Sequence, residues 1–196
     1  MKYKGITKKK KRVKANNDLI EMFIKLGTPN KQIFVAGHSC GGWVTMMLLS
    51  KNPYKIAGGI STHHACYGKL SQRYKVKKVG VDEALVKFEK KKPVAAYFRK
   101  TQIKAIREAK NLPVLIFTHP KDPFDGLLSE WVEDIPGVER IVISEDFKIN
   151  DKLCKRIGIN SGKRWEEPIK NGHLMAFADC FQFYNPKILE FIKSKI

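Results

Sequence analysis

The apolar residues in the first third of the chain switch between helical spacing and short continuous runs. Leucine, isoleucine and phenylalanine at helical spacing predict a helix over 16–26, which stops at Gly27. A continuous apolar run over 33–36 is typical of a strand buried on both faces. A second helix over 43–49 and a strand over 56–60 follow. The predicted order is therefore helix, strand, helix, strand.

The same alternation resumes after a less regular stretch at 61–112 with helices over 82–88 and 101–110 around Pro93. We interpret this stretch as a small cap or as an excursion from the domain. Strands over 113–118 and 138–143 and helices over 127–132 and 185–196 complete the pattern. Alternating strands and helices of this kind predict an α/β fold, a three-layer α/β/α sandwich with a mostly parallel sheet. At 196 residues, we expect one domain over 16–196.

Charge changes this picture only at the N-terminus. The chain carries 38 Lys and Arg against 19 Asp and Glu, a net charge of +19, and residues 1–14 hold eight of the cations and no acid. A block of like charges predicts a flexible basic leader over 1–15. The cations are mostly Lys, whereas specific nucleic-acid contacts favour Arg. We therefore expect no specific nucleic-acid partner, and no apolar run is long enough for a transmembrane segment.

The cysteines and the basic N-terminal residues indicate the cellular compartment and whether a metal site is expected. The four cysteines form no C-x-x-C pair and allow three disulfide pairings: Cys40, Cys66, Cys154 and Cys180. Basic residues at 8–12 occupy the place of the apolar core of an export signal, so we expect a cytoplasmic protein. His63 and His64 follow the strand at 56–60 and could line an active site or, with Cys66, bind a metal, but no second cluster with ligand spacing supports a metal. We expect them to be loop residues near the pocket at best. We therefore expect no metal and no cofactor.

The segment 37–42, with the sequence GHSCGG, matches the G-x-S-x-G pattern between a buried strand and a helix. This tight turn lifts the hydroxyl of Ser39 clear of the sheet, and it requires small residues at Gly37 and Gly41. Ser39 is the predicted nucleophile. The alternative is a Gly-Ser-Gly turn that only joins the two elements.

The two residues that flank Ser39 also carry side chains that could take part in catalysis, a thiol and an imidazole. Cys40 follows the apex of the turn, so we expect its backbone N–H to contribute to an oxyanion hole and its thiol only to pack. His38 is too close in the chain to fold back onto Ser39 as a base.

A serine nucleophile needs a histidine base, and the histidine needs a carboxylate to orient it. Asp122 lies just past the strand at 113–118, and Asp125 in the same loop is the second choice of acid. Asp122 as a simple turn residue is the alternative. His173 follows both in a glycine-containing loop and is the predicted base. His119 is expected only to pack beside Asp122.

On these motifs, the chain over about 17–196 resembles the α/β-hydrolase family, and more loosely its dienelactone hydrolase and small-esterase branch. The resemblance rests on the segment 37–42, the strand that leads to Asp122, and Gly172-His173. It implies that a carboxylic ester or a related acyl bond is hydrolysed through an acyl-Ser39 intermediate. His173 would act as base and then acid, and Asp122 would orient it. The expected partner is a small acyl ester; thioesters and amides are alternatives.

One departure from the family concerns the start of the chain. Members usually carry several strands before the turn, and a loop among them donates a second oxyanion N–H, whereas only 38 residues precede Ser39 here. The resemblance thus implies an N-terminally truncated fold whose strand at 33–36 is an open edge. The chain is then part of a longer hydrolase, or a second copy or another partner chain covers the edge, or the oxyanion hole is half built.

Two other functions compete with the hydrolase. The missing strands favour a catalytically idle interaction protein of the same fold, and the charge of +19 favours a polyanion-binding protein.

Overall fold

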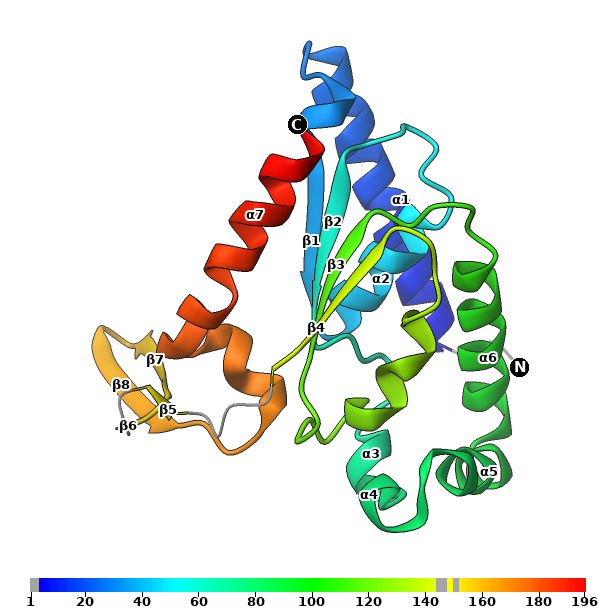
Figure 1. Ribbon diagram of the computed structural model, residues 1–196, viewed down its shortest axis with the longest axis vertical. Coiled ribbons are helices and arrows are strands. Elements are labelled where there is room, and N and C mark those ends of the chain that lie inside the picture. Colours follow the sequence, from blue (N-terminus) through cyan, green and yellow to red (C-terminus); the bar gives the residue numbers. More distant parts are fainter. Residues whose placement is uncertain (1–3, 144–147, 150–151) are drawn as a thin grey trace.

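The computed structural model describes residues 4–143, 148–149 and 152–196. A parallel sheet with the strand order β1-β2-β3-β4 runs through the middle of the molecule (Figure 1). The strands lie side by side without crossing, with Phe34 opposite Gly58 and Val114 opposite Val138. The four strands are β1 (Phe34–His38), β2 (Gly58–Thr62), β3 (Val114–Thr118) and β4 (Val138–Val142).

Helices cover both faces of this sheet, and this confirms the predicted three-layer α/β/α fold. Figure 1 shows α1, α2 and α6 on one face and α7 on the other. The side chains of β3 alternate between the two resulting cores: Ile116 belongs to the cluster that includes Trp43, and Phe117 to the cluster that includes Phe191. These helices are α1 (Lys4–Lys25), α2 (Cys40–Leu49), α6 (Pro93–Arg107) and α7 (Asn185–Lys195).

The stretch at 61–112 folds into short helices beside the carboxyl ends of the strands. Pro93 begins α6 instead of breaking a helix, because a proline at the first helical position loses no hydrogen bond. The other helices of this stretch are α3 (Leu70–Arg73), α4 (Val76–Val79) and α5 (Val81–Lys91). The 3₁₀ helix η2 (Gly126–Val132), which follows β3 in the chain, packs against α3 and α4. We call α3–α6 together with η2 the cap.

The segment between β4 and α7 was not predicted from the apolar pattern. A two-stranded antiparallel hairpin projects from the body of the molecule, with Gly158 packed directly under the Trp165 ring (Figure 1). The hairpin strands carry few apolar residues, so the alternation that marks a half-buried strand is weak. The elements are β5 (Lys148–Ile149), β6 (Lys152–Leu153), β7 (Lys155–Asn160), β8 (Lys163–Pro168) and the 3₁₀ helices η3 (Gly172–Phe177) and η4 (Asp179–Phe183).

The basic N-terminal region differs from the flexible leader expected over 1–15. The helix expected from residue 16 already begins at Lys4. Lys9 is buried, with its ammonium group 3.5 Å from the centre of the Tyr67 ring and 3.5 Å from Oε1 of Gln102. Burial lowers the pKa of Lys9 to about 7. Lysine is a good helix former, and its long aliphatic stem packs on apolar surface, so a basic run need not be disordered.

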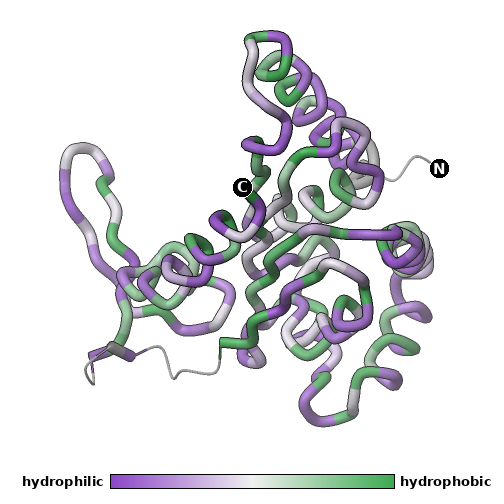
Figure 2. Tube along the Cα trace, turned by 45° about the horizontal axis from the view of Figure 1, so that its top comes forward, coloured by the Kyte–Doolittle hydropathy of each residue, from purple (hydrophilic) through white to green (hydrophobic). Residues whose placement is uncertain are grey.

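The hydrophobic residues of the chain concentrate in the central sheet. Figure 2 shows the green, hydrophobic stretches gathered in the central strands. Within the described residues, β1 pairs only with β2 and is an edge of the sheet, and a partner that covers this edge stays a prediction.

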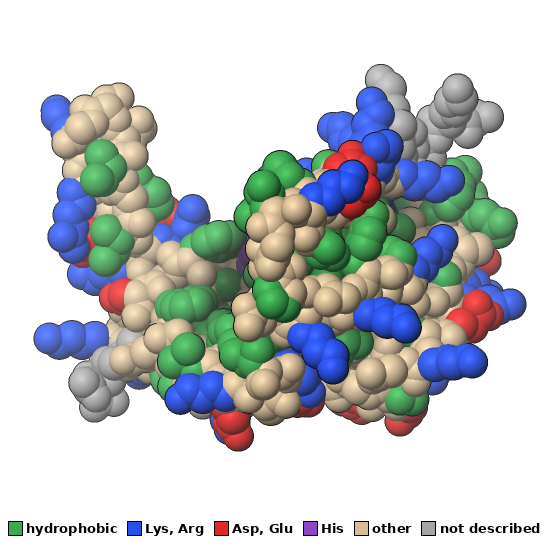
Figure 3. Space-filling model, turned by 90° about the horizontal axis from the view of Figure 1, so that it is seen from above, with side chains coloured by type: hydrophobic (Ala, Val, Ile, Leu, Met, Phe, Trp, Pro, Cys, Tyr) green, Lys and Arg blue, Asp and Glu red, His purple; other side chains and the backbone are tan. Residues whose placement is uncertain are grey.

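Figure 3 shows lysine and arginine side chains spread over the visible face instead of gathered in one patch. Among the described residues, no helix has the length and apolar character needed to cross a membrane.

Candidate active site

Ser39 stands at the turn between β1 and α2 with a backbone φ of 54° and ψ of −122°, a strained conformation for a residue with a side chain. Gly37 is required there, because an added Cβ would lie 2.3 Å from the backbone carbon of Gly41. Gly41 itself has open space around it, so the crowding expected at that position was wrong. The crowded position is Gly42, where a Cβ would lie 2.5 Å from Oγ of Ser61.

The three residues predicted from the sequence lie together although they come from distant segments. Nε2 of His173 lies 2.9 Å from Oγ of Ser39, and Nδ1 of His173 lies 2.8 Å from Oδ2 of Asp122. Asp122 and His173 are both buried. We call this arrangement the Ser-His-Asp line.

The line has a definite proton arrangement when His173 is neutral. A carboxylate only accepts hydrogen bonds, so Nδ1 of His173 carries the proton and donates a hydrogen bond to Asp122. Nε2 is then free to accept from the hydroxyl of Ser39. The hydroxyl has a second acceptor, the carbonyl oxygen of Ala65, at the longer distance of 3.4 Å. This arrangement can remove the serine proton.

Local contacts hold the base and the acid in place. The backbone N–H of His173 donates to Oδ1 of Asn171, which caps η3. The Phe124 ring stacks on the His173 imidazole with 4.1 Å between ring centres, and the Phe124 N–H donates to the second oxygen of Asp122. Gly172 is required beside His173, because a Cβ there would lie 2.4 Å from the His119 ring.

Two further histidines surround the line. His38 lies 4.6 Å from His173 between ring centres, and its Nδ1 is 3.1 Å from Oγ1 of Thr62. Burial, aided by the repulsion of His173, lowers the pKa of His38 to about 4. His38 is therefore neutral at neutral pH, and its ring bonds to Thr62, whereas His173 contacts Ser39.

His63, which was expected only as a loop residue near the pocket, lies beside Asp122. It follows β2, and its Nδ1 lies 3.7 Å from Oδ2 of Asp122 while its Nε2 bonds to the hydroxyl of Tyr184. Burial lowers the pKa of His63 well below its ordinary value. Its place at the carboxyl end of a parallel strand, where site residues of such sheets gather, is consistent with the expectation that it lies near the pocket. The sequence did not indicate its proximity to Asp122.

Asp125, the second choice of acid, lies elsewhere. It is buried, and neither of its oxygens has a hydrogen-bond partner in the part of the chain that the structure describes. Burial raises the pKa of Asp125 to about 6, against the attraction of Arg99. Asp122, and not Asp125, contacts His173.

A disulfide joins Cys40, at the start of α2, to Cys66, in the loop after β2. The expectation that the Cys40 thiol only packs was therefore wrong, because its sulfur is bonded. The other two cysteines are free and buried. Across the described ranges, the one group with three possible metal-ligand atoms within 4.8 Å of one another is Cys154, Asp179 and Cys180, and not the candidate set of His63, His64 and Cys66.

Comparisons with known proteins bear on the fold. No family model and no curated protein matches the chain. Rv0554 from Mycobacterium tuberculosis is 15% identical over 95% of this chain and 72% of its own, with a TM-score of 0.54. BpoC from the same organism is 15% identical over 94% of this chain and 73% of its own, with a TM-score of 0.52. At such identities the likeness shows a shared fold.

A third solved structure, a variant of SOBER1 from Arabidopsis thaliana, is 17% identical, with a TM-score of 0.43. It matches over 69% of this chain and 54% of its own length. The chain thus spans about half the length of SOBER1.

Proposed function

We propose that the chain is a serine hydrolase of the small-esterase type that cleaves a carboxylic ester through an acyl-Ser39 intermediate. The observation that carries the proposal is the continuous hydrogen-bonded Ser-His-Asp line, with 2.9 Å and 2.8 Å between its successive members. The strained turn at Ser39 adds support, because a positive φ at that position costs energy and is typical of a nucleophile presented on a strand-to-helix turn.

The proposed reaction has two halves. In the first, Oγ of Ser39 attacks the acyl carbon and passes its proton to Nε2 of His173. The tetrahedral intermediate then expels the alcohol, which takes that proton. In the second half, His173 removes a proton from water, and the hydroxide attacks the acyl carbon. Ser39 leaves with the returned proton, and the carboxylic acid is released. Asp122 keeps the tautomer of His173 and stabilises the imidazolium in both halves.

We assign the first oxyanion contact to the backbone N–H of Cys40. It is the first residue of α2, and the first N–H groups of a helix have no partner inside the helix. Its disulfide to Cys66 ties this end of the helix to the loop that also carries Ala65. The link thereby supports the fixed position that an oxyanion donor needs.

Hydrolysis of 4-nitrophenyl butyrate tests the proposal. We expect wild-type turnover with a burst of 4-nitrophenolate, and a loss of at least about 10³-fold in kcat for Ser39→Ala and for His173→Ala. Ser50→Ala, at the other end of α2, is the matched control and should keep wild-type turnover. Equal turnover by the wild type and Ser39→Ala would rule the proposal out.

A further inference from the structure

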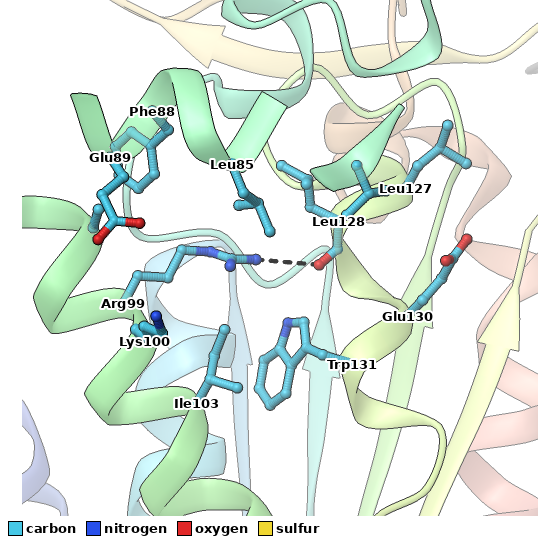
Figure 4. A pocket seen from close by; sticks show the side chains of 12 residues that line it. Leu85, Phe88, Glu89, Arg99, Lys100, Ile103, Leu127, Leu128, Glu130 and Trp131 are labelled. Carbon is cyan, nitrogen blue, oxygen red and sulfur yellow. Dashed lines mark hydrogen bonds between the residues drawn. The ribbon is translucent and has the colours of Figure 1, made fainter. Parts of the chain in front are cut away.

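An apolar cavity of about 330 Å³ lies within the cap, between α5, α6 and η2 (Figure 4). Its volume is at the lower end of the range for small-molecule sites. None of the residues of the Ser-His-Asp line contributes to its wall. The wall is formed mainly by hydrophobic side chains, among them Leu85, Phe88, Ile103, Leu127 and Leu128.

Arg99 brings a charge into this apolar space. Its side chain extends from α6 between the hydrophobic residues, as Figure 4 shows, and the residue is only 6% exposed. One terminal nitrogen, Nη2, donates to the carbonyl oxygen of Leu128 at 3.2 Å. Nε is buried and has no hydrogen-bond partner among the residues that the structure describes.

Trp131 brings a second donor to the same wall. Its indole Nε1 is likewise buried and, within the described part of the chain, without a partner. A buried donor left unpaired costs roughly 1–3 kcal/mol, and more when the group is charged. Native proteins rarely keep two such donors in one cavity without a reason, and a bound molecule that accepts both hydrogen bonds would remove the cost.

The charges around the cavity indicate which chemical group of a ligand would accept the hydrogen bonds of Arg99 and Trp131. Guanidinium and indole N–H groups only donate, so the ligand must accept. Asp125 attracts Arg99 electrostatically, but its oxygens make no hydrogen bond to any described residue and so leave the Arg99 donor unused. Glu89, Lys100 and Glu130 also line the cavity, but they are exposed, so water and salt screen their charges. A carboxylate fits a buried guanidinium best, because charge-assisted hydrogen bonds are the stronger ones.

We propose that the cap cavity binds an apolar carboxylate such as a medium-chain fatty acid. The carboxylate receives hydrogen bonds from Arg99 and Trp131, and the hydrocarbon tail lies against Leu85, Phe88 and Ile103. This site goes beyond the proposed esterase reaction and does not depend on Ser39.

Calorimetric titration with octanoate, below its micelle concentration, tests this site, with octan-1-ol as the uncharged probe of the same length. We expect octanoate to bind at least about tenfold more tightly than the alcohol, and Arg99→Met to remove that difference. Lys104→Met, at an exposed cation of α6 outside the cavity wall, is the matched control and should bind octanoate within about twofold of the wild type. Equal binding of the two probes by the wild type would overturn the proposal.

A second variant decides the matter if Arg99→Met does not fold. Ala96→Phe keeps the arginine but fills the cavity from α6, so octanoate binding should be lost while thermal unfolding shows an intact fold. Octanoate binding that survives Ala96→Phe would place the ligand elsewhere and contradict the proposal. Ser39→Ala should bind octanoate like the wild type; a loss in this variant would assign the binding to the Ser-His-Asp line instead.

Discussion

The Ser-His-Asp line and the cap cavity both contain buried polar groups, but, within the described residues, these groups are paired in the line and unpaired in the cavity. In the line, Ser39, His173 and Asp122 are joined by two hydrogen bonds of ordinary length. In the cavity, Arg99 and Trp131 each keep a buried donor without a partner in the described structure. Polar groups that are hydrogen-bonded to one another are held in a fixed geometry without a ligand. Buried donors without a partner are stabilised most when a ligand supplies the missing acceptor atoms.

The largest difference is expected between substitutions of two aspartates in one loop, Asp122 in the line and Asp125 outside it. Asp122→Asn removes the acceptor that fixes the tautomer of His173, so we expect kcat for 4-nitrophenyl butyrate to fall about 10⁴-fold. Asp125→Asn, three positions on, removes a carboxylate that makes no hydrogen bond to any described residue, so it should change kcat less than tenfold. A larger loss in Asp125→Asn than in Asp122→Asn would reverse the assignment of the acid.

The disulfide between Cys40 and Cys66 sharpens the account of the line, because it fixes the helix end beside Ser39. Replacing both cysteines with serine should lower the free energy of unfolding by about 2–4 kcal/mol. Urea denaturation with and without dithiothreitol measures this. The reductant should destabilise the wild type and leave the double variant unchanged; an insensitive wild type would show that the bond contributes nothing.

Substitution of Asp125 measures how much a buried carboxylate without a hydrogen-bond partner among the described residues lowers the free energy of unfolding. Burial raises its pKa in the folded chain from 3.8 to about 6, so the folded state binds this proton more tightly than the unfolded state. Stability from this group is present at low pH and is lost as the pH rises from about 4 to 6. At pH 8, Asp125→Asn should therefore raise the free energy of unfolding by about 1–3 kcal/mol, with little change at pH 4.

Urea denaturation at the two pH values checks this expectation. Asp134→Asn, a change at an exposed aspartate, is the control and should show no such difference. An Asp125→Asn variant that is less stable than the wild type at pH 8 would mean that the charged carboxylate has an important partner.

The smallest expected effect concerns the Phe124 ring stacked on His173. Ring pairs of this kind contribute about 0.5–1.5 kcal/mol, so Phe124→Leu should lower kcat roughly twofold to tenfold. Phe23→Leu on the exposed side of α1 is the control and should leave kcat unchanged. An unchanged kcat in Phe124→Leu would show that the stacking does not help to position the base.

The fold and the line were accessible from the sequence because both follow from local patterns and chain order. Apolar runs marked the four central strands, and the order of Ser39, Asp122 and His173 matched the order that such a sheet brings together. The cap cavity was not accessible, because the burial of Arg99 depends on packing between α5, α6 and η2. The same holds for the choice among three cysteine pairings and for the crowding at Gly42 instead of Gly41.

Labelling with a fluorophosphonate probe, followed by intact-mass measurement, tests the central claim most directly, because only an activated serine reacts readily with such a probe. We predict one adduct on the wild type and on Ser50→Ala, and none on Ser39→Ala or His173→Ala. An adduct that persists in Ser39→Ala, or a wild type that takes up no probe, would contradict the assignment of Ser39 as the nucleophile of an assembled site.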